Sequence, residues 1–104
     1  MTGVQTCALP ISAQGARALD GNTTGGGNTA TGASALESNT TGNYNTAAGL
    51  SALRVNHIGS YNTATGDYAL NDNDTGSNNT ANGDNTLFNN NGDNNTAIGA
   101  RAVV

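Results

Sequence analysis

The chain has 104 residues, of which Asn, Ala, Gly and Thr supply 64, whereas Leu, Ile, Val and Phe supply only 15, fewer than an ordinary globular core needs. With three Arg, no Lys and a net charge of −4, the chain lacks the cations that would neutralise phosphates, which excludes nucleic-acid binding as a main role. One Cys and one His leave no room for a disulfide framework, a structural zinc site or a Ser/His/Asp triad, so we expect no enzymatic activity and no cofactor.

The first eleven residues, 1–11, differ from the rest of the chain. They read MTGVQTCALPI, and a reverse translation of this segment resembles a widely used short-read sequencing adapter. A signal peptide is disfavoured, because the segment has no positively charged start and no apolar stretch of roughly 7–15 residues. We therefore expect residues 1–11 to be an adapter-derived artefact without structure. Cys7 and Pro10 then contribute nothing to the predicted fold.

From residue 12 to residue 104 the sequence is one repeated unit. Aligned on N-T-A-x-G, the units are spaced by 17, 17, 17 and 16 residues, and an earlier degenerate copy includes Ser12 to Gly15. The five clear units begin at Asn28, Asn45, Asn62, Asn79 and Asn95. The sixth copy stops at Val104, before the polar Gly turn that closes the others. We expect residues 12–104 to be one repeat domain and an internal fragment of a longer protein.

Within each unit, a small residue and a Leu follow the N-T-A-x-G motif, and an Asn-Thr-Thr-Gly type of segment comes next. A unit of this length is too short for the helical repeats, and Asn, Gly and Thr are poor helix formers. It suits two short strands and two turns per coil, the first strand on N-T-A-x-G and the second on x-x-Ala-Leu. We predict an all-β fold, a parallel β-solenoid of about six coils. One buried file is expected to hold Leu19, Leu36, Leu53, Leu70 and Leu87.

Two neighbouring positions are restricted in each predicted strand: Thr beside Ala in the first, and Ala beside Leu in the second. Alternate residues of a strand face opposite sides, so a strand with one buried face should let one of each pair vary. We infer that at least one sheet is covered on both faces, once inside the coil and once by another molecule. One Leu and two Ala per coil bury little apolar surface. Both arguments favour a symmetric oligomer.

The unit N-T-A-x-G-x-x-A-L-x-x-N-T-T-G-x-Y resembles the head repeats of trimeric autotransporter adhesins, the YadA-like heads, and is also similar to repeats in phage tail fibres. The resemblance covers residues 12–104. It implies a left-handed parallel β-roll, a homotrimer and a role in attachment at the bacterial cell surface, with a host surface, matrix protein or glycan as ligand. The fourth motif position, often Ile or Val in such repeats, is mostly polar or small here.

Few side chains are candidates for a site. Tyr44 and Tyr61 end consecutive units at equivalent places, so they should align one coil apart; packing is favoured over a glycan site. His57 is expected to be a solvated turn residue. Asp72 and Asp74 look faintly like part of a calcium loop, but the place of the twelfth-position Glu holds Asn82, which favours a polar turn. We predict no catalytic, cofactor or metal-binding residues.

The leading hypothesis is a non-enzymatic, extracellular attachment module, the head segment of a trimeric adhesin; the shaft of a phage or prophage tail fibre is the alternative. A different class is an ice- or surface-binding solenoid, because flat Thr rows can order water. An Asn-rich low-complexity segment is disfavoured, since the Leu stays in phase over five units. No apolar run approaches the roughly 20 residues that span a bilayer, so we expect no membrane insertion.

Overall fold

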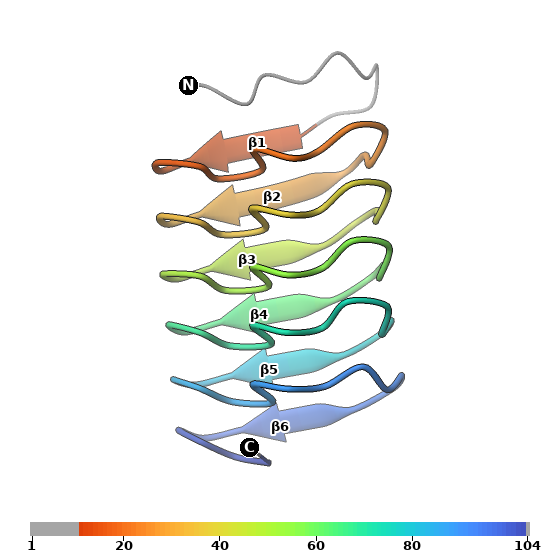
Figure 1. Ribbon diagram of the computed structural model, residues 1–104. Coiled ribbons are helices and arrows are strands. Elements are labelled where there is room, and N and C mark those ends of the chain that lie inside the picture. The colour runs from red at the N-terminus through yellow and green to blue at the C-terminus, as the bar shows by residue number, and fades with distance from the viewer. Residues whose placement is uncertain (1–10, 104) are drawn as a thin grey trace.

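The computed structural model describes residues 11–103, which form one continuous stack of coils (Figure 1). Each coil contributes one short strand, and the six strands pair in sequence order as a single parallel sheet. The strands are β1 (Ile11–Gln14), β2 (Asn28–Thr31), β3 (Thr46–Ala48), β4 (Thr63–Thr65), β5 (Thr80–Asn82) and β6 (Thr96–Ile98). The described residues contain no helix. The predicted all-β parallel solenoid is confirmed.

The winding of the coils can be followed in Figure 1. The strands run leftward along the far side, and the connecting segments run rightward along the near side, as the chain descends from β1 to β6. This path is left-handed. The predicted motif positions set the strand register: Ala30 lies opposite Ala47, an offset of 17 residues, and only the last strand pair, Thr80 with Thr96, is offset by 16.

Each strand alternates strictly between the interior and the surface. In β2, Asn28 and Ala30 are buried, whereas Thr29 and Thr31 are exposed. The strand ends where Gly32 adopts a φ of +127°, and a Cβ atom there would lie 2.5 Å from the carbonyl oxygen of Gly49 in the next coil. Only glycine combines this backbone angle with such a close approach between coils. The glycine of N-T-A-x-G therefore marks the first corner of the coil.

The predicted second strand, on x-x-Ala-Leu, does not form. In the second coil Ser34 and Leu36 have φ angles of +62° and +51°, in the left-handed region. Two successive turns result, in which the Ala35 and Glu37 amides donate to the carbonyls of Gly32 and Ser34 at 3.2 Å each. Because a left-handed residue stands on either side of Ala35, both Ala35 and Leu36 point inward, and both are fully buried. The Ala-Leu adjacency therefore needs no second covering layer, and our interpretation of it was wrong.

The Leu file is confirmed. Its members are 0–2% exposed and lie one above another along the axis of the stack. Alanines from the strand, such as Ala47, and from the turn segment, such as Ala52, complete the core. The interior is narrow, so the small Ala side chains allow the strand wall and the turn wall to approach each other around a single column of Leu.

Two ladders of buried asparagines flank this column. Asn56, in the predicted turn, donates from Nδ2 to the Gly59 carbonyl at 2.9 Å and to Oδ1 of Asn39 in the preceding coil at 2.8 Å. Asn45, at the start of the strand unit, accepts the Asn62 amide on its Oδ1 at 2.9 Å. Every buried side-chain nitrogen or oxygen within residues 11–103 has a hydrogen-bond partner. Side-chain amides thus connect the coils where the apolar core is thin.

Ile11, the last residue of the segment that we expected to lack structure, is ordered. Ile11 is the first residue of β1, pairs with Asn28 and packs partly buried against the core. It occupies the position that Asn holds in the other coils, so the ladder of strand asparagines begins one coil later, at Asn28. The remainder of the predicted artefact, residues 1–10, lies outside the described residues.

Candidate functional site

The outer face of the β1–β6 sheet carries an uninterrupted row of small hydroxyl side chains. The second motif position points outward from every strand, and the parallel register places its members directly beside one another. The row consists of Ser12, Thr29, Thr46, Thr63, Thr80 and Thr96, all exposed. Neighbouring parallel strands lie about 4.8 Å apart, so the row is regularly spaced. We call it the Thr row.

A second row on the same face is irregular. The fourth motif position also points outward, and Ile98 there is 74% exposed. The row consists of Gln14, Thr31, Ala48, Thr65, Asn82 and Ile98. The interior imposes no requirement on this position, and its residues differ from coil to coil. The outer face therefore combines one uniform row with one varied row.

Tyr44 and Tyr61 lie one coil apart and stack, as predicted. Their ring centroids are 5.2 Å apart with an interplanar angle of 18°, and the residues are 55% and 59% exposed. A Cβ atom added to Gly27 would lie 2.5 Å from Cδ1 of Tyr44, so the Tyr44 ring also lies against the glycine backbone. Sugars bind aromatic side chains through the ring face. Tyr44 therefore contacts a neighbour in the coil on either side, and a ligand role for the pair stays a prediction.

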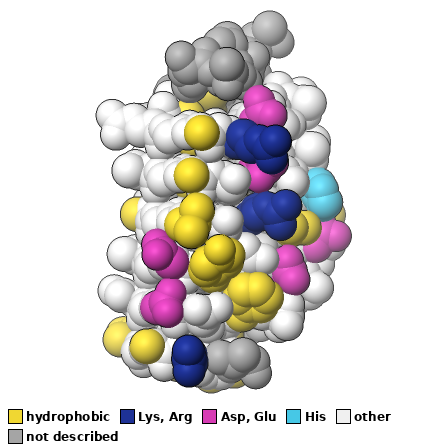
Figure 2. Space-filling model, turned by 60° about the vertical axis from the view of Figure 1, so that its left-hand side comes forward, with side chains coloured by type: hydrophobic (Ala, Val, Ile, Leu, Met, Phe, Trp, Pro, Cys, Tyr) yellow, Lys and Arg dark blue, Asp and Glu magenta, His cyan; other side chains and the backbone are white. Residues whose placement is uncertain are grey.

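The wall opposite the sheet carries a cluster of larger apolar side chains that the sequence pattern did not predict. Leu50 and Tyr68 are 40% and 37% exposed, and the Tyr68 ring lies 6.3 Å from that of Phe88. We call these three residues the aromatic patch. Figure 2 shows apolar side chains gathered on one face of the molecule, with acidic side chains on both sides of them and Arg side chains nearby. The three residues occupy three different positions of the repeat, so an alignment of the units does not bring them together.

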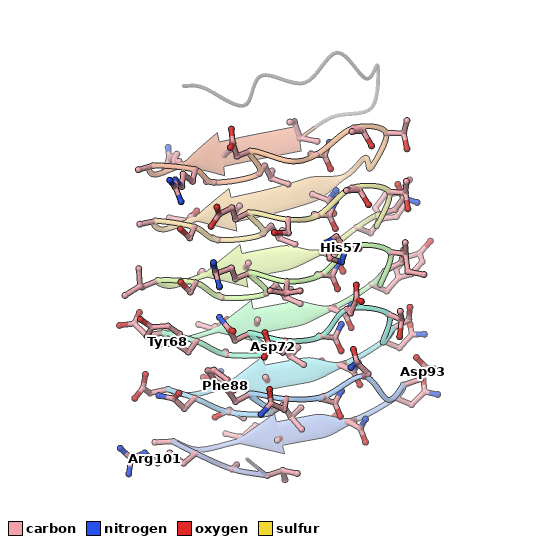
Figure 3. All side chains as sticks on the ribbon, viewed as in Figure 1. His57, Tyr68, Asp72, Phe88, Asp93 and Arg101 are labelled. Atoms are coloured by element: carbon pink, nitrogen blue, oxygen red, sulfur yellow. The ribbon has the colours of Figure 1, made fainter. Side chains whose placement is uncertain are left out.

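The charged candidates do not converge on a site. His57 Nδ1 lies 2.5 Å from Asp74 Oδ1 in the next coil, and both side chains are nearly half exposed. Asp72 instead donates its backbone amide to the Phe88 carbonyl at 2.8 Å and lies nearer the aromatic patch (Figure 3). Within the described residues, no three His, Cys, Asp or Glu side chains come together in a way that could hold a metal ion. Asp72 forms an isolated parallel β-bridge with Asn89, and Asp74 lies in the bend that follows.

One acidic side chain bridges two cations across three coils. Glu37 contacts Arg17 at 3.4 Å and Arg54 at 3.3 Å. The arginine side chains are 68% and 48% exposed, and exposed ion pairs contribute at most about 1 kcal/mol each. The two ion pairs contribute little to stability and do not create a reactive centre.

Comparisons with known proteins return no relative. No protein-family model, no curated protein and no solved structure matches the chain. Among residues 11–103 no helix is long and apolar enough to cross a membrane.

Proposed function

We propose that this chain is a non-enzymatic attachment module, a head-repeat segment of a trimeric bacterial adhesin that acts outside the cell. The observation that carries the proposal is the Thr row. Among residues 11–103 its Thr hydroxyls make no side-chain hydrogen bond, yet the row is uniform from β2 to β6.

The Thr row differs from the neighbouring row at the fourth motif position, which is irregular. Strand propensity favours Thr at exposed strand positions, but it acts equally on the fourth position, where Gln14, Asn82 and Ile98 occur. A regular partner lying along the second position explains the difference. Two further copies of the chain, arranged around a threefold axis, would supply such a partner, since a symmetric oligomer repeats one surface against itself.

In this arrangement the opposite wall stays available for a ligand. That wall varies from coil to coil and carries the aromatic patch, whereas the interior repeats almost unchanged. Exposed aromatic residues with flanking charges are typical of binding surfaces. A matrix protein or a glycan on a host surface is the ligand class that we propose.

The oligomeric state tests the assembly. The full chain should sediment at three times the chain mass, and Thr63→Lys should reduce this to the monomer, because it places three charges close together at the axis. Thr41→Lys, an exposed threonine outside the sheet, is the matched control and should leave the trimer intact. A monomer at every concentration, or a trimer that tolerates Thr63→Lys, contradicts the proposed assembly.

The attachment role is tested separately. The chain, coupled to a sensor surface, is exposed to collagen, fibronectin and mucin as probes. Retention of one probe, weakened by Tyr68→Ser but not by Thr41→Lys, is the expected outcome. Failure to retain any of the three probes would count against attachment while leaving the trimer result unaffected.

Ice or mineral binding is a second candidate that one specific observation favours. Thr29 with Thr31, and Thr63 with Thr65, point outward together from β2 and β4, so two strands carry paired threonines on a flat face. Thermal hysteresis of the full chain, lost in Thr63→Lys and kept in Thr41→Lys, would support it. This use requires an exposed Thr row, so it is incompatible with the trimer.

A further inference from the structure

The backbone fixes the stacked phenols of Tyr44 and Tyr61 as neighbours. The two residues close the second and third coils at equivalent positions, with φ angles of +56° and +60°. The Tyr61 amide donates to the carbonyl of Asn43, in the second coil, at 2.9 Å. The ring centroids are therefore held 5.2 Å apart by the stacking of the coils.

The column of rings is only two residues long. The equivalent position in the neighbouring coils carries no aromatic side chain and holds Gly27, Asn78 and Asn94. The third tyrosine of the chain, Tyr68, lies beside the ring of Phe88, which has no hydroxyl group (Figure 3). Tyr44 and Tyr61 are thus the one pair of tyrosines that stack on each other among residues 11–103.

These phenols are accessible to a one-electron oxidant. Both residues are more than half exposed. The sequence contains no Trp, and its one Met and one Cys lie within residues 1–10. Within residues 11–103 the tyrosines are therefore the side chains that such an oxidant attacks most readily.

We propose that Tyr44 and Tyr61 are a site of oxidative cross-linking, at which a dityrosine bond joins the second and third coils. The oxidant is hydrogen peroxide, used by a peroxidase. Each phenol loses one electron and one proton, and the peroxide takes up both electrons and both protons to become two waters. The two phenoxyl radicals then form a C–C bond between ring Cε atoms, and the hydrogen on each of these carbons is replaced by a proton on the phenol oxygen. The chain loses two hydrogen atoms in total.

The fold favours this coupling and gives it a consequence. Two reactants held side by side react as one unit, so the radicals combine before either meets another chain. The new bond closes a loop from residue 44 to residue 61, and closing a loop restricts the unfolded chain, as a disulfide does. The bond therefore acts as a staple between two coils, and it needs only one folded chain.

The sequence supplies an internal control. Tyr61 and Tyr68 are seven positions apart, whereas Tyr44 and Tyr61 are 17 apart. A shorter loop closes more easily in a flexible chain, so proximity in sequence would favour the Tyr61–Tyr68 link. Stacking of the coils favours the Tyr44–Tyr61 link instead.

The experiment treats the full chain, at low concentration, with hydrogen peroxide and a haem peroxidase. Trypsin cleaves after Arg54, so Tyr44 lies on one peptide and the other two tyrosines lie on the next. Mass spectrometry of the linked peptides then locates the bond, and the blue fluorescence of dityrosine measures the yield. We expect the Tyr44–Tyr61 link to exceed any other link several-fold, on chains that still run as monomers in denaturing electrophoresis.

Two variants and one melting curve complete the test. Tyr61→Phe should abolish the link, whereas Tyr68→Phe, the matched control, should leave its yield unchanged. The cross-linked chain should melt several degrees higher than the untreated chain, and peroxide-treated Tyr61→Phe should show no such rise. A predominance of Tyr61–Tyr68 links, of links between chains, or an unchanged melting temperature would overturn the proposal. Circular dichroism before treatment verifies that each variant is folded.

Discussion

At the scale of single residues, the fold depends on positive φ angles, which most residues other than glycine avoid. Ser34, Leu36 and Tyr44 all have φ between +51° and +62° within one coil, and the pattern recurs in the others. L-residues in this region carry a cost of about 1–2 kcal/mol each. The bonds and contacts between coils must outweigh this cost.

The first prediction concerns this strain. Ser34→Gly should stabilise the chain by about 0.5–1 kcal/mol, because relief of the left-handed penalty exceeds the entropy cost of glycine. Ser38, also half-buried, is not among the positive-φ residues, so Ser38→Gly should destabilise by about 0.5–1 kcal/mol. Urea denaturation of both variants measures the difference. Equal effects of the two changes would show that the backbone strain is negligible.

The asparagine ladders give the second prediction. Asn56 is fully buried, and its Oδ1 also accepts Nδ2 of Asn73 at 3.0 Å. Asn56→Ala should cost about 2–3 kcal/mol, because it leaves buried partners with missing bonds. Asn56→Asp should cost more at neutral pH, since a carboxylate would face the acceptor oxygens of Gly59 and Asn39. Asn89→Ala, at an exposed position, should stay within about 0.5 kcal/mol in the same thermal melts.

At the scale of the elements, the connections between the parallel strands are turns and not helices. Connections between parallel strands are almost always right-handed when a helix forms the crossover. Here the crossover is a series of turns that includes residues with positive φ, such as Ser34 and Leu36. The residues at the position of Ser34 share no common side chain, so the sequence does not indicate these angles.

The third prediction separates the two faces of one strand. Ala47 is 1% exposed and lies between Ala30 and Ala64, whereas the adjacent Thr46 is exposed. Ala47→Val should cost about 1–3 kcal/mol by overpacking the narrow interior. Thr46→Val should change the stability of the single chain by less than about 0.5 kcal/mol. Chemical denaturation of the two variants checks this; similar losses would mean that the assignment of faces is incorrect.

These elements show how far the sequence alone could lead. The register and the Leu file followed from the repeat, because stacking aligns equivalent positions and buries the same residue in each coil. The burial of the turn asparagines was not predicted. The second strand was wrongly predicted, because period-two reasoning assumes extended backbone, and nothing in Ala-Leu indicates positive φ. The aromatic patch was missed because Leu50, Tyr68 and Phe88 are exceptions to the repeat and meet only in three dimensions.

At the scale of the whole molecule, each coil touches only its neighbours, so stability is a sum of coils and the interfaces between them. Leu53 lies in a central coil, whereas Val103 holds the same repeat position in the last coil and is 72% exposed. Replacement of the two residues by Ala should therefore have unequal effects.

The fourth prediction follows from this geometry. Leu53→Ala should cost about 2–5 kcal/mol, and Val103→Ala less than about 0.5 kcal/mol. In native-state hydrogen exchange, the amides of β3 and β4 should be the most protected in the unmodified chain. Leu53→Ala should lower their protection toward that of β6. Uniform protection along the stack would instead indicate a single cooperative unit.

The loss of one residue in the fifth coil has a consequence for the history of such a chain. The missing residue is absorbed in the turn, and β5 and β6 still pair in register, with Asn95 continuing the ladder of Asn79 at 2.8 Å. Because all coils stack through the same contacts, the side of a coil that faces β1 fits the side of any other coil that faces β6. Tandem duplication or loss of whole units in the gene would therefore lengthen or shorten the molecule without redesigning its interior. Length becomes a trait that can vary independently of the fold, and selection could set how far such a protein reaches.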